Sequence, residues 1–256
     1  MNVYRTALRT HVGLVRTRNE DSAAALPERG LWVVADGMGG HARGDHASSL
    51  VTSRLAGLPP TDGAQDLLRA VQSALAACNR ELHAAAAREG LSGCTVVVLL
   101  AVDGHFACLW AGDTRLYRLR AGRLELLTRD HTLVQELVDR GELAPAAARV
   151  HPWRNRITRA VGIDDRLDLA ALQDRVEPGD HFLLCSDGLT GELEDDEIAL
   201  LLAAAPPEEA ADRLLALALE RGARDNVTLV VVEAGDDPDG TLQRGPGGAV
   251  AREKFS

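Results

Sequence analysis

The sequence has almost no lysine: Lys254 is the single lysine among 256 residues, and every other basic residue is an arginine. A P-loop NTPase uses a lysine to reach the phosphates, a protein kinase uses a strand lysine, and a Schiff-base enzyme uses a lysine amine. These three classes are excluded unless the C-terminal segment folds back onto the rest of the chain. A bound phosphate would have to be held by arginine, metal or backbone groups.

Other signals are also missing. The four cysteines lack CxxC spacing, so we expect reduced, buried thiols. None is followed six positions later by arginine, which excludes the Cys-x5-Arg phosphate loop, and there is no Gly-x-Ser-x-Gly elbow. No secretory segment opens the chain and no apolar run is long enough to span a bilayer, so we expect a cytoplasmic protein without membrane contact.

The charge balance is acidic, with 38 Asp and Glu against 28 Lys and Arg, a net charge of −10. This balance disfavours general binding to nucleic acids or to anionic membranes. A length of 256 residues with 46% apolar content predicts a globular protein with a substantial core.

Four aspartates stand at the ends of strongly apolar segments, separated from them by at most one residue. Asp36, Asp113 and Asp187 each follow such a segment, and Asp225 precedes one. Carboxylates at the ends of buried strands can converge on one point, where they repel each other unless hard cations lie between them. The pattern therefore predicts divalent metal ions with oxygen ligands.

Parts of these motifs also fit simpler explanations. Residues 37–42 also fit the dinucleotide fingerprint GxGxxG/A, but Asp36 would repel a pyrophosphate, and no acidic residue closes a second strand about 20 residues further on. We favour glycines that let the backbone approach a metal, with the Gly37 carbonyl as a ligand. An Asp-Gly pair alone is typical of a turn. We accept the turn for Asp103, and Asp113 is open between a turn and a ligand.

Periodicity predicts an α+β layered domain, because strands, helices, strands, helices and a last strand follow one another, with consecutive hairpins that favour antiparallel pairing. The predicted strands cover residues 9–15, 31–35, 95–102, 105–111, 115–120, 123–127, 167–172, 181–185 and 227–233. The predicted helices cover residues 45–56, 64–88, 132–140, 194–204 and 207–221. Glycine, proline and aspartate from residue 235 onward predict a disordered tail over residues 235–256.

Five motifs in order resemble one known family. They are residues 13–22 (GLVRTRNEDS), 33–41 (VVADGMGGH), 112–115 (GDTR), 186–189 (SDGL) and 225–228 (DNVT). The chain, from about Arg9 to Glu233, is similar to the bacterial branch of the metal-dependent protein phosphatases, the PPM or type 2C family. The resemblance implies a four-layer α/β/β/α sandwich of two central antiparallel β-sheets flanked by antiparallel helices. It also implies one phosphatase domain over residues 1–234, with a flap subdomain at about 142–162.

The resemblance also implies the roles of the site residues. Asp36 would bridge two Mn²⁺ or Mg²⁺ ions, Gly37 would supply its carbonyl, and Asp187 and Asp225 would complete the first ion. Asp21 and Glu20 would act mainly through metal-bound waters. Asp113, together with Asp187, would bind a third ion. Arg16 would bind the substrate phosphate. A water bridging the metals would attack phosphorus directly, without a covalent phosphoenzyme.

Some roles stay open. Met38 stands where animal members carry a histidine proposed as general acid, and His41 is either a replacement acid or a helix-start residue. Arg154 and Arg156 in the flap segment could meet phosphopeptides or belong to a solvated basic loop.

The implied function is hydrolysis of phosphoserine and phosphothreonine in proteins by a monomer that opposes a bacterial Ser/Thr kinase. The alternatives are a degenerate regulator that binds phosphoproteins and a hydrolase of small phosphate esters.

Overall fold

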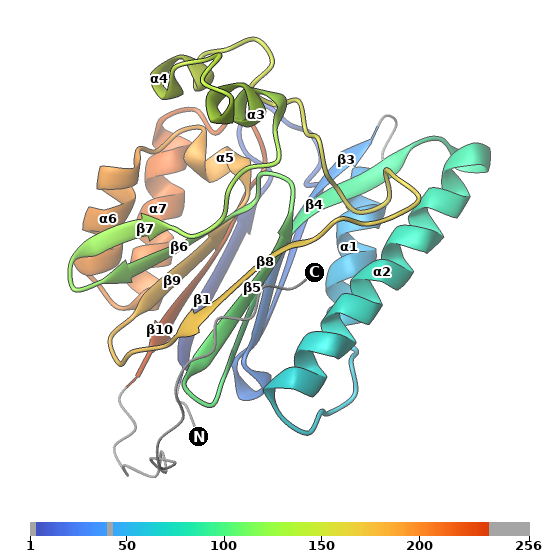
Figure 1. Cartoon of the computed structure of the whole chain (residues 1–256). Coiled ribbons are helices and arrows are strands. Elements are labelled where there is room, and N and C mark those ends of the chain that lie inside the picture. Colours follow the sequence, from blue (N-terminus) through green and yellow to red (C-terminus); the bar gives the residue numbers. More distant parts are fainter. Residues whose placement is uncertain (1–3, 40–42, 236–256) are drawn as a thin grey trace.

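Two five-stranded sheets lie face to face at the centre of the molecule, with helices on both outer faces (Figure 1). This architecture comes from a computed structural model, which describes residues 4–39 and 43–235. The first sheet has the order β1 (Tyr4–His11), β10 (Val227–Ala234), β9 (His181–Cys185), β6 (Arg115–Arg120) and β7 (Arg123–Leu126). The second has the order β2 (Asp21–Leu26), β3 (Leu31–Gly39), β4 (Ser92–Val102), β5 (His105–Ala111) and β8 (Ala170–Arg175). Every strand pair is antiparallel.

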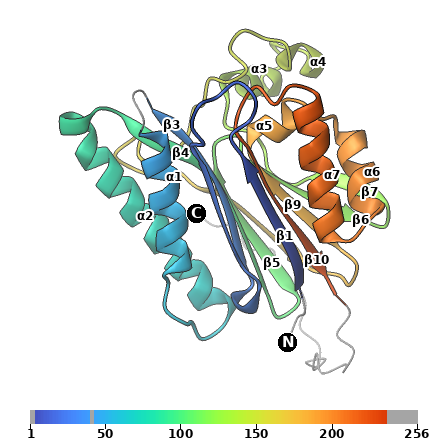
Figure 2. The same ribbon diagram turned by 180° about the vertical axis from the view of Figure 1, so that it is seen from behind.

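The helices form the two outer layers and one end of the molecule. The second sheet is covered by α1 (Gly44–Ala56) and α2 (Ala64–Glu89), and the first by α5 (Asp187–Thr190), α6 (Asp195–Ala203) and α7 (Pro207–Glu220) (Figure 2). Between β7 and β8, α3 (Leu133–Asp139) and α4 (Pro145–Ala148) lie at one end of the sandwich. A short 3-10 turn, η1 (Pro27–Arg29), joins β2 to β3. None of the described helices is both long and apolar enough to cross a membrane.

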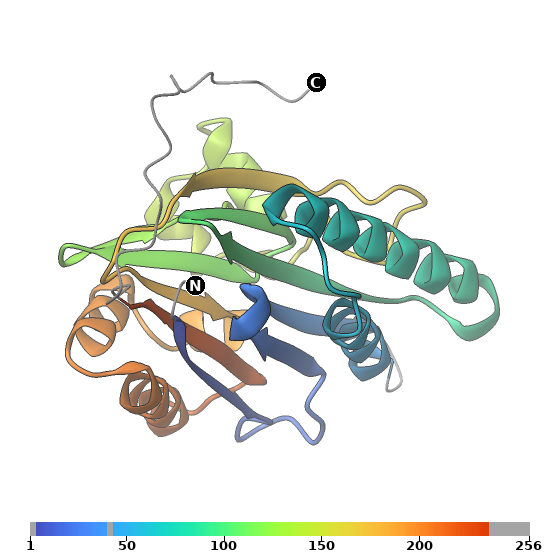
Figure 3. The ribbon, with the colours of Figure 1, turned by 90° about the horizontal axis from the view of Figure 1, so that it is seen from below.

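The view from below shows the layers of sheets and helices (Figure 3). Three apolar cores hold these layers together. One core fills the space between the sheets, around Trp32, Phe106 and Phe182. The other two lie between each sheet and its helices. Strands buried on both faces explain why the central segments read as continuous apolar runs. The predicted four-layer α+β sandwich is confirmed.

The first two strands differ from the prediction. The N-terminal strand is Tyr4–His11, whereas residues 9–15 were expected, because Val12, Leu14 and Val15 resemble a buried run. Gly13 adopts φ +82°, which turns the chain, and Leu14 and Val15 are 63% and 65% exposed. The strand β2 was missed, since its sequence DSAAAL is rich in alanine, which has low β-propensity.

The remaining differences from the prediction are small. The strand β8 begins at Ala170, three residues later than predicted, and the single-turn helices α4 and α5 are too short to leave a periodic pattern. The turn predicted at Asp103 is confirmed, with φ 51° between β4 and β5. His41 and the tail predicted for residues 235–256, apart from Gly235, lie outside the described residues.

Candidate metal and phosphate site

A cavity of about 260 Å³ is lined by residues at the C-terminal end of β3, just after β5 and just before β10. Its lining is dominated by oxygen-bearing side chains and exposed backbone: Arg16, Glu20, Asp36, Gly37, Met38, Gly39, Thr95, Asp113, Asn155, Ile157, Asp187, Asp225 and Asn226. The residues come from β3 and β4 of the second sheet, from α5 and the loops at the strand ends, and from the α3–β8 connection. The structure therefore brings together segments that are up to 210 residues apart in the sequence.

Strand register places two of the acidic residues side by side. Asp21 on β2 is the cross-strand partner of Asp36 on β3, and Asp36 in turn faces Thr95 on β4. Ser186 Oγ donates to Asp21 Oδ2 at 2.8 Å, so the end of β9 in the first sheet holds a carboxylate of the second. The site thus spans the junction of the two sheets.

Two glycines permit close backbone approach at this junction. A Cβ at Gly37 would lie 2.2 Å from the Gly44 carbonyl oxygen and 2.5 Å from that of Glu20. A Cβ at Gly188 would lie 1.9 Å from the Asn226 carbonyl oxygen. These distances are too short for any side chain, which explains why glycine directly follows Asp36 and Asp187.

The loop between β1 and β2 carries the only arginine that lines the described cavity. Arg16 is half exposed, and its Nη2 donates to Asp225 Oδ2 at 2.7 Å. A guanidinium held in this way at the mouth of a cavity can accept an oxyanion through its remaining donors.

Asn226 joins this loop to the rest of the site. Its Oδ1 accepts from the Glu20 N–H at 2.8 Å, and its Nδ2 donates to the carbonyl oxygens of Val12 and Arg18 at 2.9 and 2.8 Å. The residue was not among the predicted site residues. Its place beside Asp225 in the last motif was the available signal.

The carboxylates of the site resist simultaneous ionisation. Burial, reinforced by neighbouring carboxylates, raises the pKa of Asp21 to about 7 and that of Asp187 to about 6. Burial and the surrounding aspartates raise the pKa values of Asp36 and Asp113 well above the ordinary carboxyl range. Such a group of like charges is stable in its ionised form only with compensating positive charge.

The site also contains polar atoms without partners. Asp21 Oδ1 and Thr95 Oγ1 are buried and accept or donate no hydrogen bond within the described chain. Carboxylate and carbonyl oxygens are the ligands that Mg²⁺ and Mn²⁺ prefer, so the donor set fits these ions. In residues 4–39 and 43–235, no three acidic, histidine or cysteine side chains are arranged as a compact metal-ligand set.

Most of the predicted site residues line the cavity, but not all of them do. The cavity lining contains Arg16, Glu20, Asp36, Gly37, Asp113, Asp187 and Asp225, and Asp21 lies behind Asp36. Arg154 and Arg156 are exposed and do not line it, and the Arg156 guanidinium lies 5.6 Å from the Trp153 ring centroid. Their neighbours Asn155 and Ile157 line the cavity instead, and no pattern predicted them, because a polar loop has no periodicity.

Comparison with known proteins places this geometry in a family. The family model described as protein phosphatase 2C matches residues 15–218. The serine/threonine protein phosphatase PstP of Mycobacterium tuberculosis is 39% identical over 253 residues, which are 97% of this chain but only 48% of that protein. The chain therefore spans about half the length of this relative.

Two solved structures share the fold at high identity. The protein described as PppA, a key regulatory component of T6SS in Pseudomonas aeruginosa, has a TM-score of 0.84 at 45% identity, covering 90% of this chain and 97% of that one. The catalytic domain of PstP in complex with two manganese ions has a TM-score of 0.84 at 38% identity, covering 92% of this chain and all of that one. The chain belongs to the protein phosphatase 2C (PPM) family of metal-dependent serine/threonine phosphatases, which use Mn²⁺ or Mg²⁺.

Proposed function

We propose that this chain hydrolyses phosphoserine and phosphothreonine esters in proteins by direct attack of water on phosphorus. The observation that carries the proposal is the group of buried and partly buried aspartates that shares one cavity with a half-exposed arginine. An Arg fork suits a phosphate oxygen pair, and the carboxylates suit divalent ions. The chemistry needs no nucleophilic side chain, which agrees with four cysteines that are all buried.

The proposed ligands follow the family pattern. Asp36, Gly37, Asp187 and Asp225 would hold two Mn²⁺ or Mg²⁺ ions, with Asp21 and Glu20 in support. Asp113 would contribute to a third ion with Asp187. When bound, the ions supply the positive charge that activates water and neutralises the charge developing on the phosphoryl group.

The other residues position and balance this chemistry. Arg16 would turn from Asp225 toward the incoming phosphate, since its guanidinium has donors to spare and its side chain is 53% exposed. Asn226 fixes the backbone of the Arg16 loop at three points, which limits where the arginine can reach. Ser186 keeps Asp21 oriented behind Asp36.

We propose that the α3–β8 connection is the flap of the catalytic domain, at about residues 142–162 of a domain that covers residues 1–234. Asn155 and Ile157 support this, because they form one wall of the cavity. Arg154 and Arg156 remain candidates for contact with the phosphoprotein outside the cavity, where both are exposed.

We propose a bacterial Ser/Thr kinase as the opposing enzyme and as one of the phosphorylated substrates. The name and phosphatase activity of the relatives support phosphoproteins as the substrate class. Four free cysteines support a reducing compartment, the cytoplasm. One chain supplies every proposed site residue, so a monomer suffices for activity.

The test is Mn²⁺-dependent turnover of phosphothreonine peptides and p-nitrophenyl phosphate by wild type, Asp36→Ala and Asp187→Ala. We expect each substitution to lower kcat by about 1,000-fold, because removing a ligand costs several kcal/mol of transition-state stabilisation. The matched control is Asp62→Ala, an exposed aspartate between α1 and α2, which should keep the wild-type rate.

The outcomes separate the alternatives. Wild-type turnover in Asp36→Ala would overturn the metal assignment. A folded wild type that binds phosphopeptides but hydrolyses none with Mn²⁺ present would be the degenerate regulator. Faster turnover of phosphometabolites than of phosphopeptides would identify the hydrolase of small phosphate esters.

A further inference from the structure

The segment that leads into the flap is bound tightly to the loop that carries Asp113. Residues 127–132 connect β7 to α3 and run along β5 and β6. The Leu116 N–H donates to Thr128 Oγ1 at 3.1 Å, and Trp110 Nε1 donates to the Arg129 carbonyl at 2.9 Å. The leading segment is therefore anchored in the sandwich and does not move freely with the flap.

A partly buried ion pair strengthens this anchor. The Arg115 guanidinium forks onto Asp130, with Nε–Oδ1 at 2.9 Å and Nη2–Oδ2 at 2.6 Å. Arg115 Nη1 also donates to Tyr117 Oη at 3.0 Å, which donates to Asp195 Oδ1 at the start of α6. Arg115 is the first residue of β6 and lies two residues after Asp113. The ion pair therefore ties Asp130 to the chain next to Asp113.

His131 makes two hydrogen bonds to Gly112, the residue that precedes Asp113. The ring Nδ1 of His131 accepts from the Gly112 N–H at 3.1 Å, and the backbone N–H of His131 donates to the Gly112 carbonyl at 2.9 Å. Gly112 adopts φ +110°, and a Cβ there would lie 2.3 Å from Thr95 Cβ, so the loop has one tight conformation. Two hydrogen bonds thus lock the residue that precedes Asp113 to His131.

The same residue also reaches the returning limb of the flap. The Thr158 N–H donates to the His131 carbonyl at 2.8 Å, and the Leu133 N–H donates to the Arg156 carbonyl at 2.8 Å. Between these two bonds lies Ile157, which lines the cavity together with Asn155. His131 therefore lies between the Asp113 loop and the wall that the flap gives to the cavity.

We propose that His131 is a positioning residue that couples the flap wall, at Asn155 and Ile157, to Asp113: its carbonyl holds the flap limb, and its Nδ1 and backbone N–H hold Gly112. The inference rests on the proposed function for its effect on turnover, but the coupling itself does not. A neutral imidazole with its proton on Nε2 is required, because only an unprotonated Nδ1 can accept from Gly112. Burial and then Arg159 lower the pKa of His131, which favours that neutral form.

Two substitutions separate the acceptor atom from the packing of the ring. The His131 ring also stacks on Trp110, with centroids 6.0 Å apart and planes at 6°. His131→Asn keeps an acceptor near the position of Nδ1 but loses the stacked ring. His131→Phe keeps the stacked ring but has no acceptor. A residue that only packs would tolerate Phe better than Asn.

The experiment measures kcat and KM for p-nitrophenyl phosphate, and backbone hydrogen exchange at residues 111–114 and 154–158, in the full-length chain. We expect His131→Phe to lower kcat by about 10- to 100-fold with little change in KM, because the flap wall of the cavity and the Asp113 carboxylate would both be misplaced. Exchange should rise in both segments together. His131→Asn should restore most of kcat and of the protection. The control is His105→Ala, an exposed histidine of the β4–β5 hairpin, which should behave as wild type.

Wild-type kcat and exchange in His131→Phe, or a better rescue by Phe than by Asn, would overturn the proposal. Hydrogen exchange that rises in only one of the two segments would also overturn it, since coupling requires both. If the wild type hydrolyses no phosphate ester, the proposed function fails, and the exchange data still decide the coupling.

Discussion

Single side chains in this molecule hold loops that no secondary structure supports. Asn226 satisfies three backbone groups of residues 12–20 and is itself 5% exposed. Such a residue uses the full donor and acceptor capacity of an amide. Its removal leaves buried backbone groups without partners, which costs more than the bonds themselves contribute.

We predict that Asn226→Ala lowers the free energy of unfolding by about 3 kcal/mol, because one buried donor and two acceptors lose their partner. The Arg16 loop loses its anchor at the same time, so KM for phosphopeptides should rise. Chemical denaturation and steady-state kinetics measure the two effects.

Asn79→Ala is the matched control. Asn79 also bridges buried backbone, accepting from the Gly162 N–H at 2.6 Å and donating to the Asp164 carbonyl at 2.9 Å, but it lies on α2 and does not line the cavity. Its replacement should cost similar stability and leave KM unchanged. Equal changes of KM in both variants would contradict a specific role for Asn226.

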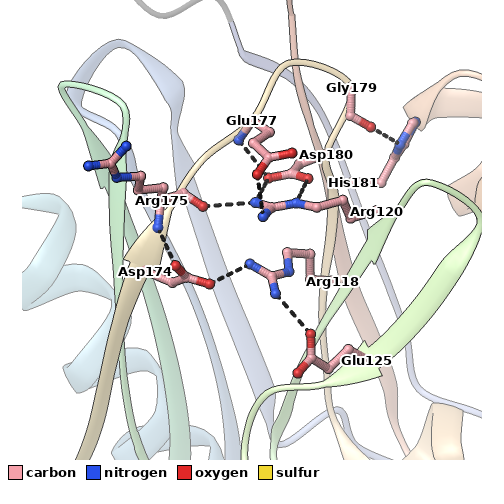
Figure 4. A network of polar contacts seen from close by, with 9 residues as sticks. All are labelled: Arg118, Arg120, Glu125, Asp174, Arg175, Glu177, Gly179, Asp180 and His181. Atoms are coloured by element: carbon pink, nitrogen blue, oxygen red, sulfur yellow. Dashed lines mark hydrogen bonds and ion pairs between the residues drawn. The ribbon is translucent and has the colours of Figure 1, made fainter.

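At the scale of elements, two arginines of β6 tie the sheets together at the end away from the cavity (Figure 4). Arg118 donates to Asp174 on β8 and to Glu125 on β7, both at 2.8 Å. Arg120 forks onto Asp180 with both distances at 2.6 Å and donates to the Arg175 carbonyl at 2.8 Å. One strand of the first sheet is thus bound to an edge strand of the second, which protects that edge.

The two arginines differ in how deeply their acidic partners are buried. The side chain of Asp180 is 0% exposed, whereas those of Asp174 and Glu125 are 50% and 48% exposed. We predict that Arg120→Ala lowers the free energy of unfolding by about 3 kcal/mol, because a buried carboxylate loses its counter-ion. Arg118→Ala should cost about 1 kcal/mol, since water takes over its acidic partners.

Denaturant titration of both variants tests this order, and kcat should stay at the wild-type value in each, because neither arginine lines the cavity. A larger loss for Arg118→Ala than for Arg120→Ala would show that partner burial does not decide the cost.

At the scale of the whole molecule, the buried carboxylates link folding to pH and to metal. Asp21 and Asp187 have pKa values of about 7 and about 6 in the folded chain, against an ordinary value of 3.8. Between pH 4 and pH 7 the folded chain therefore binds protons that the unfolded chain has released. Stability from these groups is full below the ordinary pKa and is lost as pH rises through the folded values.

We predict that the chain in EDTA loses several kcal/mol of unfolding free energy between about pH 5 and pH 8, since each unit of pKa shift corresponds to about 1.4 kcal/mol. Mn²⁺ should raise Tm more at pH 8 than at pH 5, because ionised carboxylates bind the ion. Thermal unfolding with EDTA or Mn²⁺ across this range measures both effects.

Asp21→Asn is the control for this prediction. The amide can still accept from Ser186 Oγ, but it does not ionise, so the pH dependence in EDTA should become shallower. Burial lowers the pKa of His131 and so acts in the opposite direction near neutral pH, but it acts equally in both proteins. An identical slope in wild type and Asp21→Asn would contradict the assignment.

Local signals explain which elements were predicted and which were not. The segments 95–102, 105–111 and 181–185 are apolar and β-branched or aromatic, and their strands are confirmed within three residues. The strand β2 has an alanine-rich sequence that favours no strand, and it forms because β3 and α1 cover it. Tertiary packing overrides propensity there.

The sequence by itself determined the chemistry of this protein: the aspartates at strand ends, the glycines after them, Arg16, and the absence of usable lysine and cysteine nucleophiles. These follow from residue type and spacing, which do not depend on the rest of the fold. Only the tertiary structure decided which residues meet. Strand register set Asp21 against Asp36, Asn226 reached the Arg16 loop from the far end of the chain, and the flap turned Asn155 and Ile157 into the cavity. Such contacts depend on the packing of segments distant in sequence, and no local pattern encodes that packing.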